Sequence, residues 1–272
     1  MMIRNAPPEI LDMRDRGALF VVNHSGGKDS QAMLVALRGW GVPDAQLLLI
    51  HADLGEVEWG GNVAHIRATA PDLPLIVAKP ATGFFDMVER RGMFPSPSVR
   101  QCTSDLKRGP IEREVRRYLK AHPEFNGLVV SCMGLRSEES AARAKKAPLT
   151  FSARNSKAGR SWYDWLPILT WTLPAVWLAI RNAGETPHPV YAAGMSRLSC
   201  RFCIMANRAD LTTAARLSPA LYAKYVATEK RLGFTLSPSR RGLEEITGIA
   251  ADPGWDDGAI AAEAEAVWDR VA

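Results

Sequence analysis

Short apolar runs alternate with helix-like segments through the first half of the chain. The runs are bounded by turn residues, which is typical of buried strands, and they cover residues 18–23, 46–51, 75–78 and 128–133. Helices are expected at residues 31–40, 62–70, 103–121 and 137–146, with a break at Pro110. This alternation predicts an α/β fold with an open, doubly wound, mainly parallel sheet covered by helices.

The second half of the chain changes character. Thr172 precedes a predicted helix that runs to about Ala183, and residues 211–232 are mostly helical in pattern. Residues 241–272 carry 2 basic and 8 acidic side chains and are predicted to form a peripheral helix or a partly ordered tail. We therefore expect one α/β domain at residues 1–207, with residues 208–272 as a helical C-terminal extension of the same domain.

Composition places the chain among ordinary globular proteins. It has 272 residues, of which 47% are hydrophobic and 23% are charged. No apolar run approaches the roughly 18 residues of a membrane span, and the first residues lack the order of a secretory signal. A cytoplasmic protein without a membrane partner is expected. Four cysteines are too few for a disulfide scaffold, so catalytic or metal-binding roles are favoured.

Positive charge is concentrated in the middle of the chain. Residues 90–160 hold 16 Lys and Arg against 6 Asp and Glu, a balance of +10, whereas the remainder has a balance of −5. Such a stretch suits a polyanion, for example nucleotide phosphates, sulfate or a nucleic-acid backbone. A solvated basic helix face is the alternative.

The most informative segment is NHSGGKDS at residues 23–30, which follows a predicted strand and opens a predicted helix. Adjacent glycines allow a tight turn that exposes successive N–H groups, and the helix N-terminus adds to this anion site. Hydroxyls and a lysine complete it. The alternative is a Gly-Gly turn with a surface lysine. The pattern G-x-x-x-x-G-K-[ST] is absent, so cleavage between β and γ phosphates is not expected.

SGGKDS resembles the signature of the PP-loop ATP pyrophosphatases. The resemblance implies an adenine nucleotide alpha hydrolase-like fold that binds ATP with Mg²⁺ and cleaves between the α and β phosphates. Lys28 and Asp29 are then catalytic candidates. The residues implied to hold the pyrophosphate and its metal are Ser25, Gly26, Gly27, Lys28, Asp29 and Ser30.

Further segments resemble the phosphoadenosine phosphosulfate (PAPS) reductase-like branch of that family. They follow the family's order from about Phe20 to Met205. These segments are HADLGE at 51–56, Cys102-Thr103 with Lys107 and Pro110, GLRSEESAAR at 134–143, WLPILTWTLPAVW at 165–177, and HPVY at 188–191 followed by Gly194, Arg197 and the C-x-x-C at 200–203. The resemblance implies that Asp53 and Gly55 line the adenosine side of the site.

Gly134, Arg136 and Arg143 are the candidate residues of the GLRSEESAAR segment. Gly134 is assigned to the ATP site, and the two arginines to phosphate or an anionic substrate, which a guanidinium binds with two parallel hydrogen bonds. Their spacing of seven puts both arginines on one face if the helix forms. The alternative pairs Arg136 with Glu138 or Glu139 in a surface ion pair. The tryptophans 165, 171 and 177 are expected to pack in the core rather than to stack on bases.

Cys200 and Cys203 form a C-x-x-C that fits zinc, a redox pair or an iron–sulfur cluster. A thioredoxin-like context, which would favour the redox pair, is missing. Members of the resembled branch with an upstream cysteine often hold a [4Fe–4S] cluster, which implies Cys102, Cys200 and Cys203 as ligands. Cys132 is either a fourth ligand or a buried, inert cysteine.

These inferences predict an adenylating ATP pyrophosphatase that transfers sulfur to nucleic acid. The pattern is closest to the ATP pyrophosphatase component of DNA phosphorothioation systems. DNA is the expected acceptor ahead of tRNA, a cysteine desulfurase is the expected sulfur donor, and an oligomer is left open. The alternatives are tRNA thiolation, sulfate adenylyltransferase chemistry, an ATP-sensing subunit, and sulfonucleotide reduction, which the lack of any cysteine after Cys203 disfavours.

Overall fold

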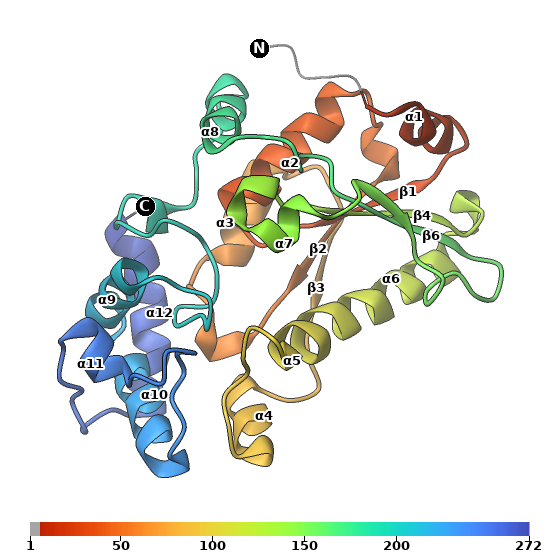
Figure 1. The fold of residues 1–272 in the computed structure, drawn as a ribbon. Helices are drawn as coiled ribbons and strands as arrows, with labels where there is room; N and C mark the ends of the chain where they lie inside the picture. The colour runs from red at the N-terminus through yellow and green to blue at the C-terminus, as the bar shows by residue number, and fades with distance from the viewer. Residues whose placement is uncertain (1–5, 272) are drawn as a thin grey trace. The chain divides into compact units, whose positions relative to one another are not determined.

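A computed structural model describes residues 6–271 and contains one six-stranded sheet (Figure 1). The strand order is β3-β2-β1-β4-β6-β5. β1 runs parallel to β2 and β4, β4 runs parallel to β6, and only β5 is antiparallel to its neighbour β6. The strands are β1 (Leu19–Asn23), β2 (Leu47–Ala52), β3 (Leu75–Ala78), β4 (Leu128–Met133), β5 (Leu149–Phe151) and β6 (Ser161–Trp165). The predicted mainly parallel α/β fold is confirmed.

The four strands expected from the sequence are present within one residue of their predicted bounds. Every residue of β2, and all but the last residue of β1 and β4, is buried. Burial on both faces explains why these strands are continuous apolar runs rather than alternating ones. β5 and β6 were not predicted, because β5 spans three residues with mostly exposed side chains and β6 mixes polar with aromatic residues.

Helices connect the strands and form most of the chain after β6. They are α1 (Pro8–Asp15), α2 (Lys28–Gly39), α3 (Asn62–Thr69), α4 (Phe84–Arg91), α5 (Gln101–Thr103), α6 (Gly109–Ala121), α7 (Ala141–Ala144), α8 (Leu173–Asn182), α9 (Arg208–Leu217), α10 (Pro219–Leu232), α11 (Leu243–Thr247) and α12 (Asp257–Val271). The last four confirm that the C-terminal stretch is helical. Among the helices within residues 6–271, none is long and apolar enough to cross a membrane.

Two predicted helices differ from the structure. The helix expected at 137–146 is a 3-10 turn (Ser137–Glu139) followed by the short α7, because Ser140 between them is extended and its hydroxyl caps α7 by accepting from the Arg143 N–H at 3.2 Å. In the helix expected at 103–121, Ser104–Arg108 forms a π-helical turn. Pro110 does not break that helix but lies in the first turn of α6, where a missing N–H is tolerated.

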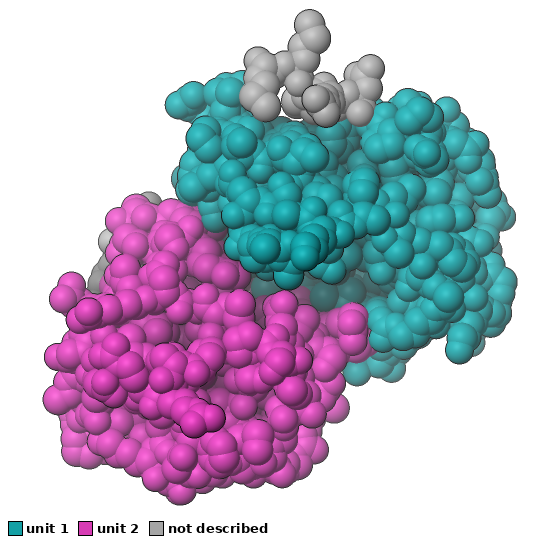
Figure 2. All heavy atoms as spheres, in the orientation of Figure 1, with its two compact units in different colours: residues 1–51, 65–77, 111–187 teal, residues 52–64, 78–110, 188–272 magenta. Residues whose placement is uncertain are grey.

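The chain divides into two compact units, each with its own core (Figure 2). Unit 1 comprises residues 1–51, 65–77 and 111–187, and its core joins β1, β2 and β4 to side chains of α1, α2 and α8. Unit 2 comprises residues 52–64, 78–110 and 188–272, and aromatic rings of α4 and α10 dominate its core. The domain boundary predicted at residue 207 stays a prediction.

The strand order reverses direction at β1 in unit 1. β2 lies on one side of β1 and β4 lies on the other, so the connections leaving β1 and β4 diverge at their carboxyl ends. In open α/β sheets this reversal point is where ligands bind. The Asn23 amide ties the two ends together by donating to Ser131 Oγ at 3.1 Å and to the Cys132 carbonyl at 2.9 Å.

Candidate functional site

The SGGKDS loop joins β1 to α2 at this reversal point, as predicted. Gly26 has a left-handed φ of 80°, and Gly27 is the N-cap of α2, whose N-terminus no side chain caps. Ser30 Oγ holds the loop closed, since it donates to the Gly27 carbonyl at 2.8 Å and accepts from the Ser25 N–H at 3.3 Å. The result is an ordered turn that leads into an uncapped helix N-terminus, which is a favourable environment for phosphate.

Lys28 is buried rather than displayed on the surface. Only 4% of the residue is exposed, and its ammonium group lies 3.0 Å from Asp29 Oδ2. A buried ammonium group requires a charged partner, and Asp29 supplies one. The alternative of a Gly-Gly turn with a surface lysine is therefore wrong.

Arg136 reaches the same carboxylate from the loop after β4. Its Nε lies 2.7 Å from Asp29 Oδ1, and its guanidinium also pairs with Glu138. Burial lowers the pKa of Arg136, but the carboxylates of Asp29 and Glu138 outweigh burial and raise it. Arg136 is 5% exposed and the Glu138 side chain is 41% exposed, so the pairing with Glu138 given as the alternative is present beside the ion pair with Asp29.

Arg143 is linked to this arrangement through Glu139, whose Oε2 also accepts from the Arg136 N–H at 2.8 Å. It pairs with Glu139, four residues earlier, and the extended Ser140 separates it from Arg136. The expectation that both arginines share one helical face is wrong, because no continuous helix joins them. Its role in binding an anion stays a prediction.

Gly134 allows the loop after β4 to touch the first turn of α2. A Cβ atom at this position would lie 2.9 Å from the backbone carbon and oxygen of Asp29 and 3.1 Å from the Ser30 nitrogen. Backbone atoms at that distance cannot give way as a flexible side chain would. Gly134 is thus required by the close approach of the two loops, and its assignment to the ATP site stays a prediction.

Three buried histidines behind the loop were not identified from the sequence. His24 Nδ1 accepts from the Gly26 N–H at 3.1 Å, and His51 Nδ1 lies 2.9 Å from the His24 carbonyl oxygen. Burial, with His65 and His51 nearby, lowers the pKa of His24 to about 3, and burial lowers that of His65 to about 4. His24 and His65 are therefore neutral at pH 7, and His24 orients the left-handed Gly26. The signal for His24 in the sequence was a histidine two residues before the first glycine of the loop.

The residues assigned to adenosine belong to unit 2. Asp53 Oδ1 accepts from the Gly55 N–H at 2.8 Å, which forms a tight turn with Gly55 at a φ of 63°. Lys79 Nζ lies 3.7 Å from Asp53 Oδ2. The glycine is needed for this turn, and the contact of both residues with adenosine stays a prediction.

Three of the four cysteines gather in unit 2. Cys102, Cys200 and Cys203 interact electrostatically with one another and with Lys107. Burial raises the pKa of Cys200 to about 12, and burial followed by the charge of Cys203 raises that of Cys102. Burial lowers the pKa of Lys107, yet the negative charges of Cys200, Glu58 and the other two cysteines outweigh it and raise the pKa. Lys107 is thus a cation placed among three thiols.

These thiols provide the donor type that iron–sulfur clusters and zinc require. Among the His, Cys, Asp and Glu side chains that the structure describes, however, no group of three is arranged to hold a metal ion. The assignment of Cys102, Cys200 and Cys203 as ligands of a [4Fe–4S] cluster therefore stays a prediction.

Cys132 lies in a different environment. It is fully buried in β4 of unit 1, its Sγ lies 3.6 Å from the Val130 carbonyl oxygen, and burial raises its pKa well above the ordinary value. These features favour the alternative of an inert core cysteine.

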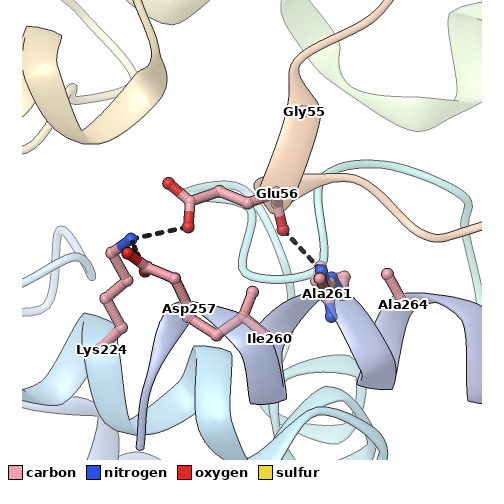
Figure 3. A pocket seen from close by; sticks show the side chains of 8 residues that line it. Gly55, Glu56, Lys224, Asp257, Ile260, Ala261 and Ala264 are labelled. Atoms are coloured by element: carbon pink, nitrogen blue, oxygen red, sulfur yellow. Dashed lines mark hydrogen bonds and ion pairs between the residues drawn. The ribbon is translucent and has the colours of Figure 1, made fainter.

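Unit 2 also contains a cavity of about 510 Å³ (Figure 3). Lys224 Nζ bridges Glu56 Oε2 at 2.7 Å and Asp257 Oδ1 at 3.0 Å, and the buried Arg201 donates to the Glu56 carbonyl at 2.6 Å. Two cations and two carboxylates balance each other, so this wall does not favour a polyphosphate. The cavity is lined by Gly55, Glu56, Arg201, Lys224, Asp257, Ile260, Ala261 and Ala264.

Residues 20–206 match the phosphoadenosine phosphosulfate reductase domain, and the chain belongs to this family. The match spans most of the chain and includes the loop, the two arginines and all four cysteines. The predicted membership of the PAPS reductase-like branch is confirmed at this level.

Two curated relatives are proteins named as uncharacterized. One, in the gpa 5′ region of Escherichia phage 186, is 29% identical over 170 residues, which cover 62% of this chain and 48% of that protein. The other, MJ0973 of Methanocaldococcus jannaschii, is 28% identical over 221 residues, 80% of this chain and 49% of that protein. The chain thus spans about half the length of the curated relatives it matches.

Solved structures with some similarity include two fungal enzymes. PAPS reductase from Candida auris aligns with a TM-score of 0.47 and 14% identity, covering 73% of this chain and 89% of that one. FMN adenylyltransferase from Candida glabrata aligns with a TM-score of 0.43 and 16% identity, covering 68% and 53%.

Proposed function

We propose that this protein is an ATP pyrophosphatase that adenylates an acceptor and acts in sulfur transfer to nucleic acid. The observation that carries the proposal is the junction of Lys28, Asp29 and Arg136 at the reversal point of the sheet, beside an uncapped helix N-terminus. The junction places two buried cations beside a loop able to bind phosphate. Family membership supports a nucleotide of the adenylate type as the ligand.

In the proposed reaction, an acceptor oxygen attacks the α phosphorus of ATP, the bond from that phosphorus to the bridging oxygen breaks, and pyrophosphate leaves with the electron pair. The N–H groups of the loop and the ammonium group of Lys28 would bind the departing pyrophosphate, where negative charge grows. Arg136 would hold Asp29 in place and add positive charge. Mg²⁺ bound with ATP would neutralise part of the phosphate charge, and Asp29 is the carboxylate nearest to it.

The sulfur-transfer step is the finer part of the proposal. A sulfur nucleophile at the oxidation level of sulfide would attack the adenylated centre, and AMP would leave with the electron pair of the broken bond. A cysteine desulfurase would supply the sulfur as a persulfide, and a thiol reductant, itself oxidised to a disulfide, would reduce that persulfide to sulfide. Cys102, Cys200 and Cys203 would hold a [4Fe–4S] cluster, whose chemistry is to bind or deliver sulfide, and Lys107 would offset the negative charge of the thiolates.

The products formed from ATP test the first step. The full chain is incubated with ATP, Mg²⁺ and single-stranded DNA, and the nucleotides are separated by chromatography. We expect AMP and pyrophosphate. Formation of ADP and phosphate would contradict the proposal. Absence of ATP turnover both with nucleic acid and with sulfate as acceptor would contradict it as well. Release of sulfite from PAPS with a thiol reductant would instead favour sulfonucleotide reduction, the alternative suggested by the family's name.

Iron and acid-labile sulfide per chain, measured after anaerobic purification, test the cluster. We expect about four of each, with a broad visible absorption band, as for a [4Fe–4S] centre. One zinc per chain and no iron would remove the cluster from the proposal and leave a plain adenylating enzyme.

A further inference from the structure

One surface segment of unit 1 carries only positive charge. Residues 140–163 contain six Lys and Arg and no Asp or Glu. The segment includes α7, β5 and the first part of β6, and β5 is the outermost strand of the sheet (Figure 1). We call residues 143–160 the basic arm. Its cations are Arg143, Lys145, Lys146, Arg154, Lys157 and Arg160.

Most of these cations are not neutralised by the protein. Arg143 pairs with Glu139, and Arg154 pairs with Glu112. The other four have no ion pair with any residue in the described part of the chain. Lys145, Lys146 and Lys157 are exposed. An excess of unpaired positive charge along one surface segment attracts an external polyanion.

The loop that joins β5 to β6 is held in one conformation. The buried Asn155 donates from its amide to Glu112 Oε1 at 3.1 Å, and its backbone N–H donates to the Ser152 carbonyl at 3.0 Å. Ser156 Oγ accepts from the Trp162 N–H at 2.9 Å. The backbone that carries Arg154 and Lys157 is therefore ordered without a partner, which lowers the entropic cost of binding.

An aromatic ring lies within the basic arm. Phe151 is 52% exposed and contacts the ring of Tyr163 on β6 edge to face, with 5.3 Å between ring centroids. Lysines on an edge strand commonly serve to prevent its pairing with a strand of another molecule. An exposed phenylalanine beside them does not help to prevent such pairing, but it can stack on a base, as aromatic side chains do in proteins that bind single-stranded nucleic acid.

We propose that the basic arm binds the backbone of single-stranded nucleic acid, with Phe151 stacked on an unpaired base. The partner is single-stranded because a paired base offers no free face to the ring. This inference rests on the proposed function in one respect, which is that nucleic acid is the acceptor in the proposed reaction. The binding itself needs no ATP turnover.

Fluorescence anisotropy tests the inference, with the full chain and a labelled DNA strand of about 16 nucleotides. This length is the upper end of the site sizes of single-strand-binding domains. The measurement is repeated over a range of salt concentrations and with the matching duplex. The test variants are K145Q/K146Q/K157Q and Phe151→Ala. The matched control is K230Q/R231Q/R241Q, which removes the same charge from exposed side chains of unit 2.

The K145Q/K146Q/K157Q variant should bind the DNA strand at least tenfold more weakly. The slope of the logarithm of the association constant against the logarithm of salt concentration should become shallower by about 2, because each lost phosphate contact accounts for about 0.7. Phe151→Ala should weaken single-strand binding by about 5- to 100-fold with the slope unchanged. The control should change affinity less than twofold. Circular dichroism of each variant establishes that it is folded.

The proposal is overturned if the basic-arm variant binds like the wild type, or if the control loses as much affinity. Preference for the duplex would overturn the single-strand assignment. Binding to poly-glutamate but not to the oligonucleotide would assign the arm to an acidic protein instead. Failure of binding alongside normal AMP formation would reject this inference and leave the ATP pyrophosphatase proposal intact.

Discussion

Arg136 Nε lies 2.7 Å from Asp29 Oδ1, and this ion pair joins residues 107 positions apart in the chain. Asp29 lies in the first turn of α2, after the loop that follows β1, whereas Arg136 follows β4. The pair therefore connects the two loops that diverge at the reversal point of the sheet. The position of the Asp29 carboxylate, between Arg136 and Lys28, depends on it.

The ion pair should contribute measurably to stability. We expect Arg136→Ala and Asp29→Ala each to lower the free energy of unfolding in urea by about 1–3 kcal/mol, because each leaves a poorly solvated partner behind. The double variant should lose about 1–2 kcal/mol less than the sum, since the partners are coupled. Arg16→Ala removes an exposed pair and should change stability by less than about 0.5 kcal/mol. Additive losses would show that the two residues act independently.

Lys28→Ala should lower the rate of AMP formation by about 100-fold or more, because it removes a buried cation from the site where pyrophosphate gains charge. Lys120→Ala removes an exposed lysine of the same unit and serves as the control. A normal rate of AMP formation by the Lys28 variant would remove the loop from the catalytic site.

Gly134→Ala should destabilise the fold by about 1–3 kcal/mol, because the new methyl group meets backbone atoms of Asp29 and Ser30 at about 3 Å. It should also weaken ATP binding in calorimetry, since the phosphate loop must move. Gly242→Ala is the control, as its Cβ would meet only a side-chain oxygen of Glu229 at 3.5 Å. Equal effects of the two substitutions would argue against close packing as the reason for Gly134.

Acid should destabilise the protein through His24. The folded pKa of His24 is about 3, below the ordinary 6.5, so the unfolded state binds more protons between these values. The free energy of unfolding then falls as pH drops through this interval, by up to about 1.4 kcal/mol per pH unit for one group. His24→Asn keeps an acceptor for the Gly26 N–H and should reduce this slope. His122→Asn, at a half-buried histidine that pairs with Glu124, is the comparison, and equal slopes for all three proteins would contradict the assignment.

The cysteines should differ in their effect on bound iron. Cys200→Ser should lose most of the iron while the chain stays folded, because a ligand of the proposed cluster is removed. Cys132→Ala should keep the iron content and instead lose some stability through a small cavity in the core of unit 1. Unchanged iron in the Cys200 variant would exclude that residue from the site, and loss of iron in the Cys132 variant would make Cys132 a ligand.

The local sequence pattern was sufficient to predict the strands whose residues are almost all buried. The apolar runs of β1, β2 and β4 identified the buried strands, and SGGKDS identified the loop between β1 and α2. The short edge strand β5 and its neighbour β6 were missed because pairing with adjacent strands, not their composition, makes them strands. The helix expected at residues 137–146 was wrong because one side chain, Ser140, hydrogen-bonds the backbone and interrupts it.

The sequence by itself determined the kind of protein: a parallel α/β sheet with a phosphate-binding loop and a cysteine pair of the PAPS reductase domain family. Only the tertiary structure decided which side chains meet. Glu138 could be named as a partner of Arg136 from the sequence, but Asp29 could not, because only the register of β1 and β4 brings Asp29 into reach. The neutral state of His24 and His65 and the four unpaired cations of the basic arm follow from the same cause, since burial and pairing depend on neighbours distant in the chain.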